Sequence, residues 1–96
     1  MIVSMFQVIL ELPEAGTIKD KRRVVNSIKD RIRAKFHVSC AEIDLQDSLG
    51  FAHLGAALVS NSAEFGEKVM RKALAVIEDD FCLRVHDSQI ASERFE

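Results

Sequence analysis

The sequence contains few prolines and glycines, which interrupt secondary structure, and few cysteines, which can form disulfides. Its 96 residues include one proline, four glycines and two cysteines, Cys40 and Cys82, which lack C-x-x-C spacing. Such low proline and glycine content, without any polar tract, excludes a long flexible linker, and we expect one domain over residues 1–96. Two isolated cysteines exclude a disulfide scaffold and indicate reduced thiols buried in strands.

Targeting and catalytic signatures are also missing. The first six residues show no basic segment and no cleavage signature, and their apolar run is too short to cross a bilayer. The sequence contains no P-loop, no Rossmann glycine fingerprint and no G-x-S-x-G elbow. These absences favour a cytoplasmic protein that is not an enzyme, uses no cofactor or metal and has no membrane partner.

Charge is divided unevenly along a chain whose net charge is only −2. Residues 17–36 hold eight of the thirteen basic residues and two of the fifteen acidic ones, so this segment is near +6 and the remainder near −8. A basic face can act locally on a molecule that is acidic overall. The segment is therefore the first candidate for a binding surface.

Hydrophobic periodicity predicts six elements in the order β-α-β-β-α-β. Alternating or apolar runs predict strands over 2–12, 38–47, 51–60 and within 81–90, the last centred on Leu83 and Val85, while 91–96 stay unassigned. Residues 13–16 break the first strand, and helical spacing follows Thr17 and Asn61, each expected as an N-cap. With right-handed crossovers, this order gives a ferredoxin-like α+β sandwich. Its antiparallel sheet has strand order 4-1-3-2, with both helices on one face.

The first strand carries apolar side chains on both faces. Phe6, Val8, Leu10 and Leu12 alternate without a charge and are assigned to the core. The opposite face presents Val3, Met5 and Ile9, which suggests that a partner covers it, such as a second copy in a homodimer. The alternative is that these three side chains are merely scattered apolar surface.

The first helix places its basic residues beside an apolar stripe formed by Ile18, Val25, Ile28, Ile32 and Phe36. Arg22, Lys29 and Arg33 align on one flank of the stripe, Lys19 and Arg23 lie further round, and the Lys21 stem is expected to pack while its ammonium reaches water. Arg22, Lys29 and Arg33 are the expected phosphate contacts, assisted by Lys19, Lys21 and Arg23. The alternative is that these charges pair with acids of the same molecule or of a neighbouring subunit.

The segment Thr17–Val25, read T-I-K-D-K-R-R-V-V, resembles the S-L-K-x-K-R-x-V-V stretch of the YlxP-like bacterial proteins, a domain of unknown function. Ala41-Glu42, Gln46-Asp47 and the segment 54–61 are also similar, so the resemblance covers about Leu10 to Val76. Thr17 replaces the serine, and the hairpin Ser48–Phe51 lacks the family's tryptophan. The resemblance implies a ferredoxin-like fold without established activity. Because members tend to be encoded beside translation-initiation and ribosome-maturation factors, it also implies a link to structured RNA or the ribosome.

Three other arrangements are weaker candidates. Stacking of bases on the sheet, as in RNA recognition motifs, is disfavoured because the sequence has no tryptophan or tyrosine. A zinc site built from His37, Cys40, Cys82 and His86 would need ligands from opposite edges of the expected sheet. An acid–base site at Glu42, Asp44, Asp47 and His53 has no accompanying nucleophile, and it would need a defined pocket beside Asp47 and His53.

Overall fold

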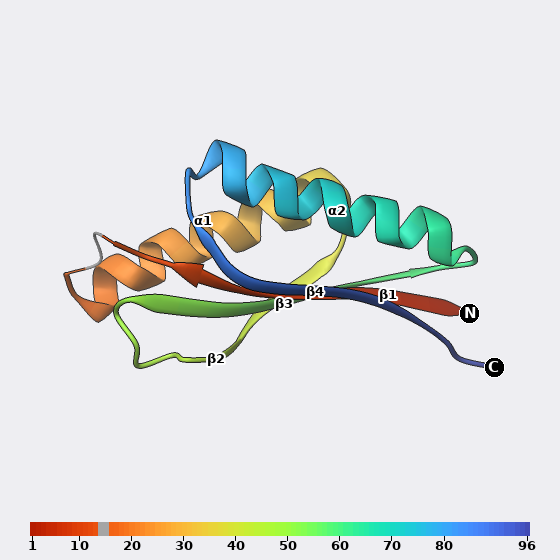
Figure 1. The fold of residues 1–96 in the computed structure, drawn as a ribbon, viewed down its shortest axis with the longest axis horizontal. Helices are drawn as coiled ribbons and strands as arrows, with labels where there is room; N and C mark the ends of the chain where they lie inside the picture. Colours follow the sequence, from red (N-terminus) through yellow and green to blue (C-terminus); the bar gives the residue numbers. More distant parts are fainter. Residues whose placement is uncertain (14–15) are drawn as a thin grey trace.

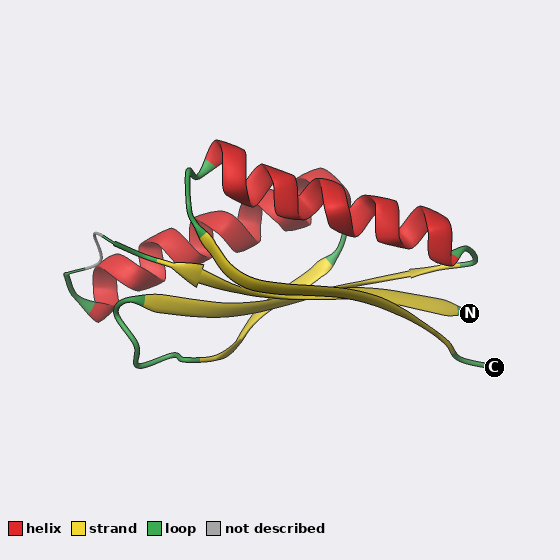
Figure 2. Cartoon of the chain, viewed as in Figure 1, coloured by secondary structure: helices red, strands yellow, loops and turns green. Residues whose placement is uncertain are grey.

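Six elements follow one another in the expected order in the computed structural model, which describes residues 1–13 and 16–96. They are β1 (Ile2–Glu11), α1 (Ile18–Phe36), β2 (Ser39–Asp44), β3 (Phe51–Ser60), α2 (Ala63–Asp80) and β4 (Val85–Arg94). Both helices lie on one side of the sheet, and the other side is left uncovered (Figures 1 and 2). This arrangement confirms the α+β ferredoxin-like sandwich. The break expected after β1 includes Glu14 and Ala15, which lie outside the described residues.

The sheet has the order β2-β3-β1-β4, which is the predicted order 4-1-3-2 seen from the other side. β1 lies between β3 and β4 and pairs antiparallel with both along nearly its whole length. β2 is short and its register shifts between Glu42 and Asp44, whereas β4 shifts register only near its start. β2 and β4 are thus the two edge strands of the described sheet.

The fourth strand was placed wrongly by its hydrophobic pattern. Leu83 lies before the strand and Val85 is its first residue, while 91–94 belong to β4. The physical reason is that the N–H and C=O groups of β1 that point away from β3 need partners, so the polar segment Asp87–Arg94 pairs with them although it lacks apolar alternation. Backbone pairing, not side-chain burial, decides the extent of this strand.

The core lies between the sheet and the two helices. Phe6, Val8, Leu10 and Leu12 are buried there, as their alternation predicts. They meet the α1 stripe and the α2 stripe, whose buried members include Val25, Ile28, Ile32, Met70, Ala73 and Ile77. Neither helix is long and apolar enough to cross a bilayer.

The helices begin at side-chain caps. Thr17 Oγ1 accepts the Asp20 N–H at 3.1 Å, which confirms the first predicted cap. The second prediction is wrong by one residue, because Ser62, not Asn61, caps α2 by accepting the Phe65 N–H at 3.2 Å. Ser60 Oγ fixes this turn by accepting the Ser62 N–H and donating to the Ser62 carbonyl, and the backbone of Ser62 is then extended as a cap requires.

Candidate nucleic-acid interface

The helical period of α1 places its apolar residues on one face and most of its charged residues on the other. Its buried residues Val25, Ile28 and Ile32 belong to the core between the sheet and α2, and most of its charged residues are exposed to solvent. Basic residues Arg33 and Lys35 occupy the last turn, where a cation interacts favourably with the helix dipole. The helix ends at His37, whose left-handed backbone (φ 55°) lets its N–H bond the Arg33 carbonyl.

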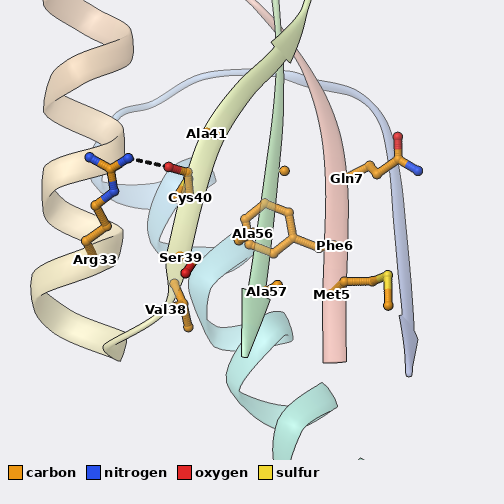
Figure 3. A pocket seen from close by; sticks show the side chains of 11 residues that line it. Met5, Phe6, Gln7, Arg33, Val38, Ser39, Cys40, Ala41, Ala56 and Ala57 are labelled. Carbon is orange, nitrogen blue, oxygen red and sulfur yellow. Dashed lines mark hydrogen bonds between the residues drawn. The ribbon is translucent and has the colours of Figure 1, made fainter. Parts of the chain in front are cut away.

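Arg22, Lys29 and Arg33 form the basic row, a name used below for these three residues. Arg22 and Arg33 are exposed and Lys29 is half-buried. Eleven residues separate the ends of the row, so its Cα atoms extend over about 16 Å. The Arg33 guanidinium also donates to the Cys40 carbonyl of β2 (Figure 3). Asp30 Oδ1 lies 4.0 Å from a nitrogen of the same guanidinium. The row therefore runs along the outer side of the β2 edge.

Lys21 is not available to a ligand, which corrects the expectation that its ammonium reaches water. The side chain is 1% exposed, and Nζ donates to the carbonyls of Leu45 and Gln46. Glu42 Oε2 lies 3.1 Å from Nζ, close enough for an ion pair although its geometry is not that of a hydrogen bond. The hairpin after β2 folds back over the start of α1, and this is why the ammonium is enclosed.

The other basic residues of α1 fall into two groups. Arg31 is paired with Asp80 of α2, so part of the helix charge is neutralised within the molecule. Lys19, Arg22, Arg23, Lys29 and Lys35 make no ion pair with any residue in 1–13 or 16–96. Self-pairing thus accounts for Lys21, Arg31 and, weakly, Arg33, while most of the positive surface stays unpaired within the described chain.

The uncovered side of the sheet, called the open face below, is a second candidate surface. Val3, Met5 and Ile9 are half-buried on it, and the register places Val59 of β3 opposite Val3 and His53 opposite Ile9. Val59 is 62% exposed and Ile43 of β2 is 46% exposed. A shallow hollow of about 570 Å³ lies between β1 and β2, with Met5 and Gln7 projecting from β1 (Figure 3). Gly55, Ala57 and Ala41 also line it.

Of the acid–base candidates, Asp44 lies opposite His53 where β2 pairs with β3, but the four residues do not form one site. His53 Nε2 lies 3.0 Å from Gln7 Oε1 on the open face, beside a small hollow of about 180 Å³ that Asp87 and Gln89 also line. Asp47 is not among the residues around this hollow, and Glu42 is engaged by Lys21.

The zinc candidates also lie apart. Cys40 is buried on β2, while Cys82 is exposed beyond α2, which corrects the expectation that both thiols are buried in strands. Burial raises the pKa of the Cys40 thiol, an effect that the nearby charges of Arg33 and Lys29 and a hydrogen bond from the Ala41 backbone only partly oppose. Among the residues that the structure describes, no three His, Cys, Asp or Glu side chains gather as metal ligands would.

Sequence reasoning missed two features of this region. One is the enclosure of Lys21 by the carbonyls of Leu45 and Gln46, which follow β2 in the chain. The only available signal was the position of Lys21 beside the apolar stripe, which indicates burial of the stem but names no partner. The other is the bond from Arg33 to β2, which no spacing in the sequence encodes.

Comparison with known proteins gives two matches. Residues 3–90 match the family model described as "Protein of unknown function (DUF503)". The curated protein "Uncharacterized protein YlxP" of Bacillus subtilis (strain 168) is 40% identical over 65 residues, which are 68% of this chain and 71% of that protein. The match agrees with the resemblance of the lysine–arginine stretch of α1.

Proposed function

Because the chain belongs to the DUF503 family, whose function is unknown, we propose its role from its surface: a small cytoplasmic, non-enzymatic protein that binds structured RNA, free or within ribosomal particles. The observation that carries this proposal is the unpaired positive surface of α1. Lys19, Arg22, Arg23 and Lys29 make no ion pair within residues 1–13 and 16–96, and Arg33 extends the surface along β2.

The physical basis is the release of counterions from the nucleic-acid backbone. Each phosphate that a lysine or arginine neutralises frees condensed cations, and the gain in entropy drives binding at low salt. A rigid helix holds its charges at fixed spacing, and the basic row of about 16 Å matches several consecutive phosphates. Because the chain has no tryptophan or tyrosine, and Phe51 of the open face packs edge-on against His86, contacts to the backbone and to the shape of folded RNA are favoured over base readout.

The test is the affinity for an RNA hairpin across a salt series from about 50 to 200 mM. We expect the negative slope of log affinity against log salt to become shallower by roughly 0.7 to 0.9 for each phosphate contact that R22E/K29E/R33E removes. Since Arg33 also holds β2, the double variant R22E/K29E, with circular dichroism of each variant, separates binding from folding. The matched control is K68E/R71E/K72E on α2, which changes the net charge equally.

Two results would contradict the proposal. One is the absence of binding at low salt. The other is an equal loss of slope in the α1 and α2 variants, which would show a general charge effect and no role for α1 in particular.

A second candidate function is a homo-oligomeric interaction module that associates through the open face. The observation in its favour is the exposure of Val59 and Ile43 beside the half-buried Val3, Met5 and Ile9. Sedimentation of the wild type and of V59E tests it, because a charge at the centre of a packed interface would dissociate the oligomer. An oligomer of unchanged stability in V59E would exclude this face as the interface.

A further inference from the structure

The two edge strands of the sheet differ in how well they are protected from pairing with another chain. The β2 edge is short, with six residues, and its register shifts at Glu42. Arg33 donates a hydrogen bond to the Cys40 carbonyl on this edge. Lys21 donates to the carbonyls of Leu45 and Gln46 just beyond it. Short length, irregular register and covering charges are the means by which proteins prevent an edge strand from pairing with another chain.

The β4 edge lacks this protection over most of its length, since its register shifts only near its start. β4 has ten residues, and its register with β1 is regular from Asp87 to Arg94. Its central residues Ser88–Ser92 carry neither a charge nor a proline. Within residues 1–13 and 16–96, no strand lies beyond β4. A long edge with a regular and uncharged centre is a template for strand pairing, and its presence opposite a protected edge points to an interface.

The hydrogen-bonding groups of this edge can be assigned. The Phe95 N–H bonds the Met1 carbonyl at 2.8 Å, so the backbone of odd-numbered residues from Asp87 onward points toward β1. The N–H and C=O groups of Ser88, Ile90, Ser92 and Arg94 consequently point outward. They are the donors and acceptors that a further antiparallel strand would use.

We propose that β4 pairs with β4 of a second copy, antiparallel and with Ala91 on the two-fold axis, which joins the two sheets into one. In this register Ile90 hydrogen-bonds Ser92 of the second copy, and Ser88 hydrogen-bonds Arg94 of the second copy. The two Ala91 residues face each other as a non-hydrogen-bonded pair, with their Cβ atoms roughly 4.5 to 5.5 Å apart. The inference does not depend on RNA binding, and it uses an edge, not the open face.

Charge complementarity favours this register over one centred on Ile90, and it favours a second copy as the occupant. With Ala91 on the axis, Glu93 lies opposite Gln89, whose amide can donate to the carboxylate, and Arg94 lies opposite the neutral Ser88. A register centred on Ile90 would instead place Asp87 opposite Glu93, and like charges directly opposite are destabilising. The strand is thus complementary to itself in the first register, and both partners present the same length of unpaired backbone.

The experiment is analytical ultracentrifugation from micromolar to millimolar concentration, on the wild type, S88P and S88A. S88P removes an outward N–H and none of the donors that bond β1, but each dimer loses two donors and should dissociate about tenfold more readily or worse. S88A keeps the N–H and should dimerise like the wild type. V59E, on the open face, should also leave this dimer unchanged.

The register is tested by charges at the axis. A91D and A91K should each be monomeric where the wild type is dimeric, because like charges meet across the axis, and an equimolar mixture should form a heterodimer. Circular dichroism of each variant verifies folding. A wild type that is monomeric throughout, or a dimer that S88P leaves intact, would overturn the proposal. If S88P abolishes the dimer but the mixture of A91D and A91K stays monomeric, the edge is the interface and the proposed register is wrong.

Discussion

Lys21 shows how a charged side chain can be structural in a segment whose other charges face solvent. Its ammonium is enclosed by Glu42 and by two carbonyls that lie 24 and 25 residues further along the chain. Taking a lone ammonium out of water is costly, but here the carbonyls and the carboxylate compensate it. The side chain therefore fixes the hairpin after β2 to the start of α1.

Replacing Lys21 with methionine should lower the free energy of unfolding by about 3 kcal/mol, because Glu42 and two carbonyls lose their partner while the stem volume is kept. Urea unfolding measures the change. R22M is the matched control, since the neighbouring side chain is exposed and its removal should leave stability unchanged. Equal effects of the two substitutions would show that Lys21 contributes no more than a surface lysine.

The Cys40 thiol should make stability depend on alkaline pH. Burial raises its pKa in the folded state, so the folded protein keeps a proton that the unfolded chain releases. This contribution is complete below the ordinary thiol pKa of about 8.5 and is lost as pH rises through the higher folded pKa. Urea unfolding at about pH 8 and about pH 10 should show a smaller loss in C40A than in the wild type or in C82A. Parallel losses in all three proteins would refute this role.

At the scale of elements, the turn between β3 and α2 shows how neighbouring hydroxyl groups choose a helix start. Asn61 and Ser62 both have side chains suited to a cap, and Glu64 follows Asn61 at capping-box spacing. Ser60 resolves the choice because its hydroxyl bonds both the N–H and the carbonyl of Ser62. The helix therefore begins one residue later than the capping box indicates.

The substitution S62A should cost about 1 kcal/mol of stability, because the Phe65 N–H loses its acceptor in the first turn of α2. Thermal or urea unfolding gives the value. The neighbouring substitution N61A serves as the control, and it should have little effect because Asn61 lies outside the helix. The reverse order of the two effects would place the cap at Asn61 after all.

At the scale of the whole molecule, the helix layer and the sheet approach each other closely at Gly66 of α2. A Cβ atom at this position would lie 2.0 Å from Ser4 Oγ and 2.6 Å from Ser4 Cβ, both well inside van der Waals contact. Ser4 is fully buried on β1, and its hydroxyl bonds that of Ser92 on β4 at 2.8 Å. The absence of a side chain at Gly66 thus sets the distance between the two layers at this end of the core.

Substituting Gly66 with alanine should destabilise the protein by about 1–3 kcal/mol, as overpacking does. The direction is informative, because alanine in a helix interior is otherwise favoured over glycine by about 1 kcal/mol. Unfolding in urea tests the change, with G50A as the control, since no atom lies within 4 Å of a Cβ at Gly50. S4G removes both clashing atoms and should restore stability to G66A. If G66A is more stable than the wild type, the helix layer and the sheet can separate at this point without a loss of stability.

The sequence by itself determined the features that depend on near neighbours in the chain. Periods of two and 3.6 residues assign β1 and α1 to their faces, and the handedness of crossovers then leads to the strand order. The basic surface of α1 is local in the same sense, because one helix carries it. The family resemblance is most specific in the same stretch.

Tertiary structure alone decided the features that depend on distance between segments. No local pattern shows that Lys21 meets the hairpin after β2 or that Arg33 reaches Cys40, because these contacts join parts of the chain that only the fold brings together. The length of β4 likewise follows from the ten residues of β1 beside it and not from its own polar sequence. Its bare edge, opposite the covered edge of β2, exists only once the sheet is assembled, because being an edge is a property of the sheet and not of the strand.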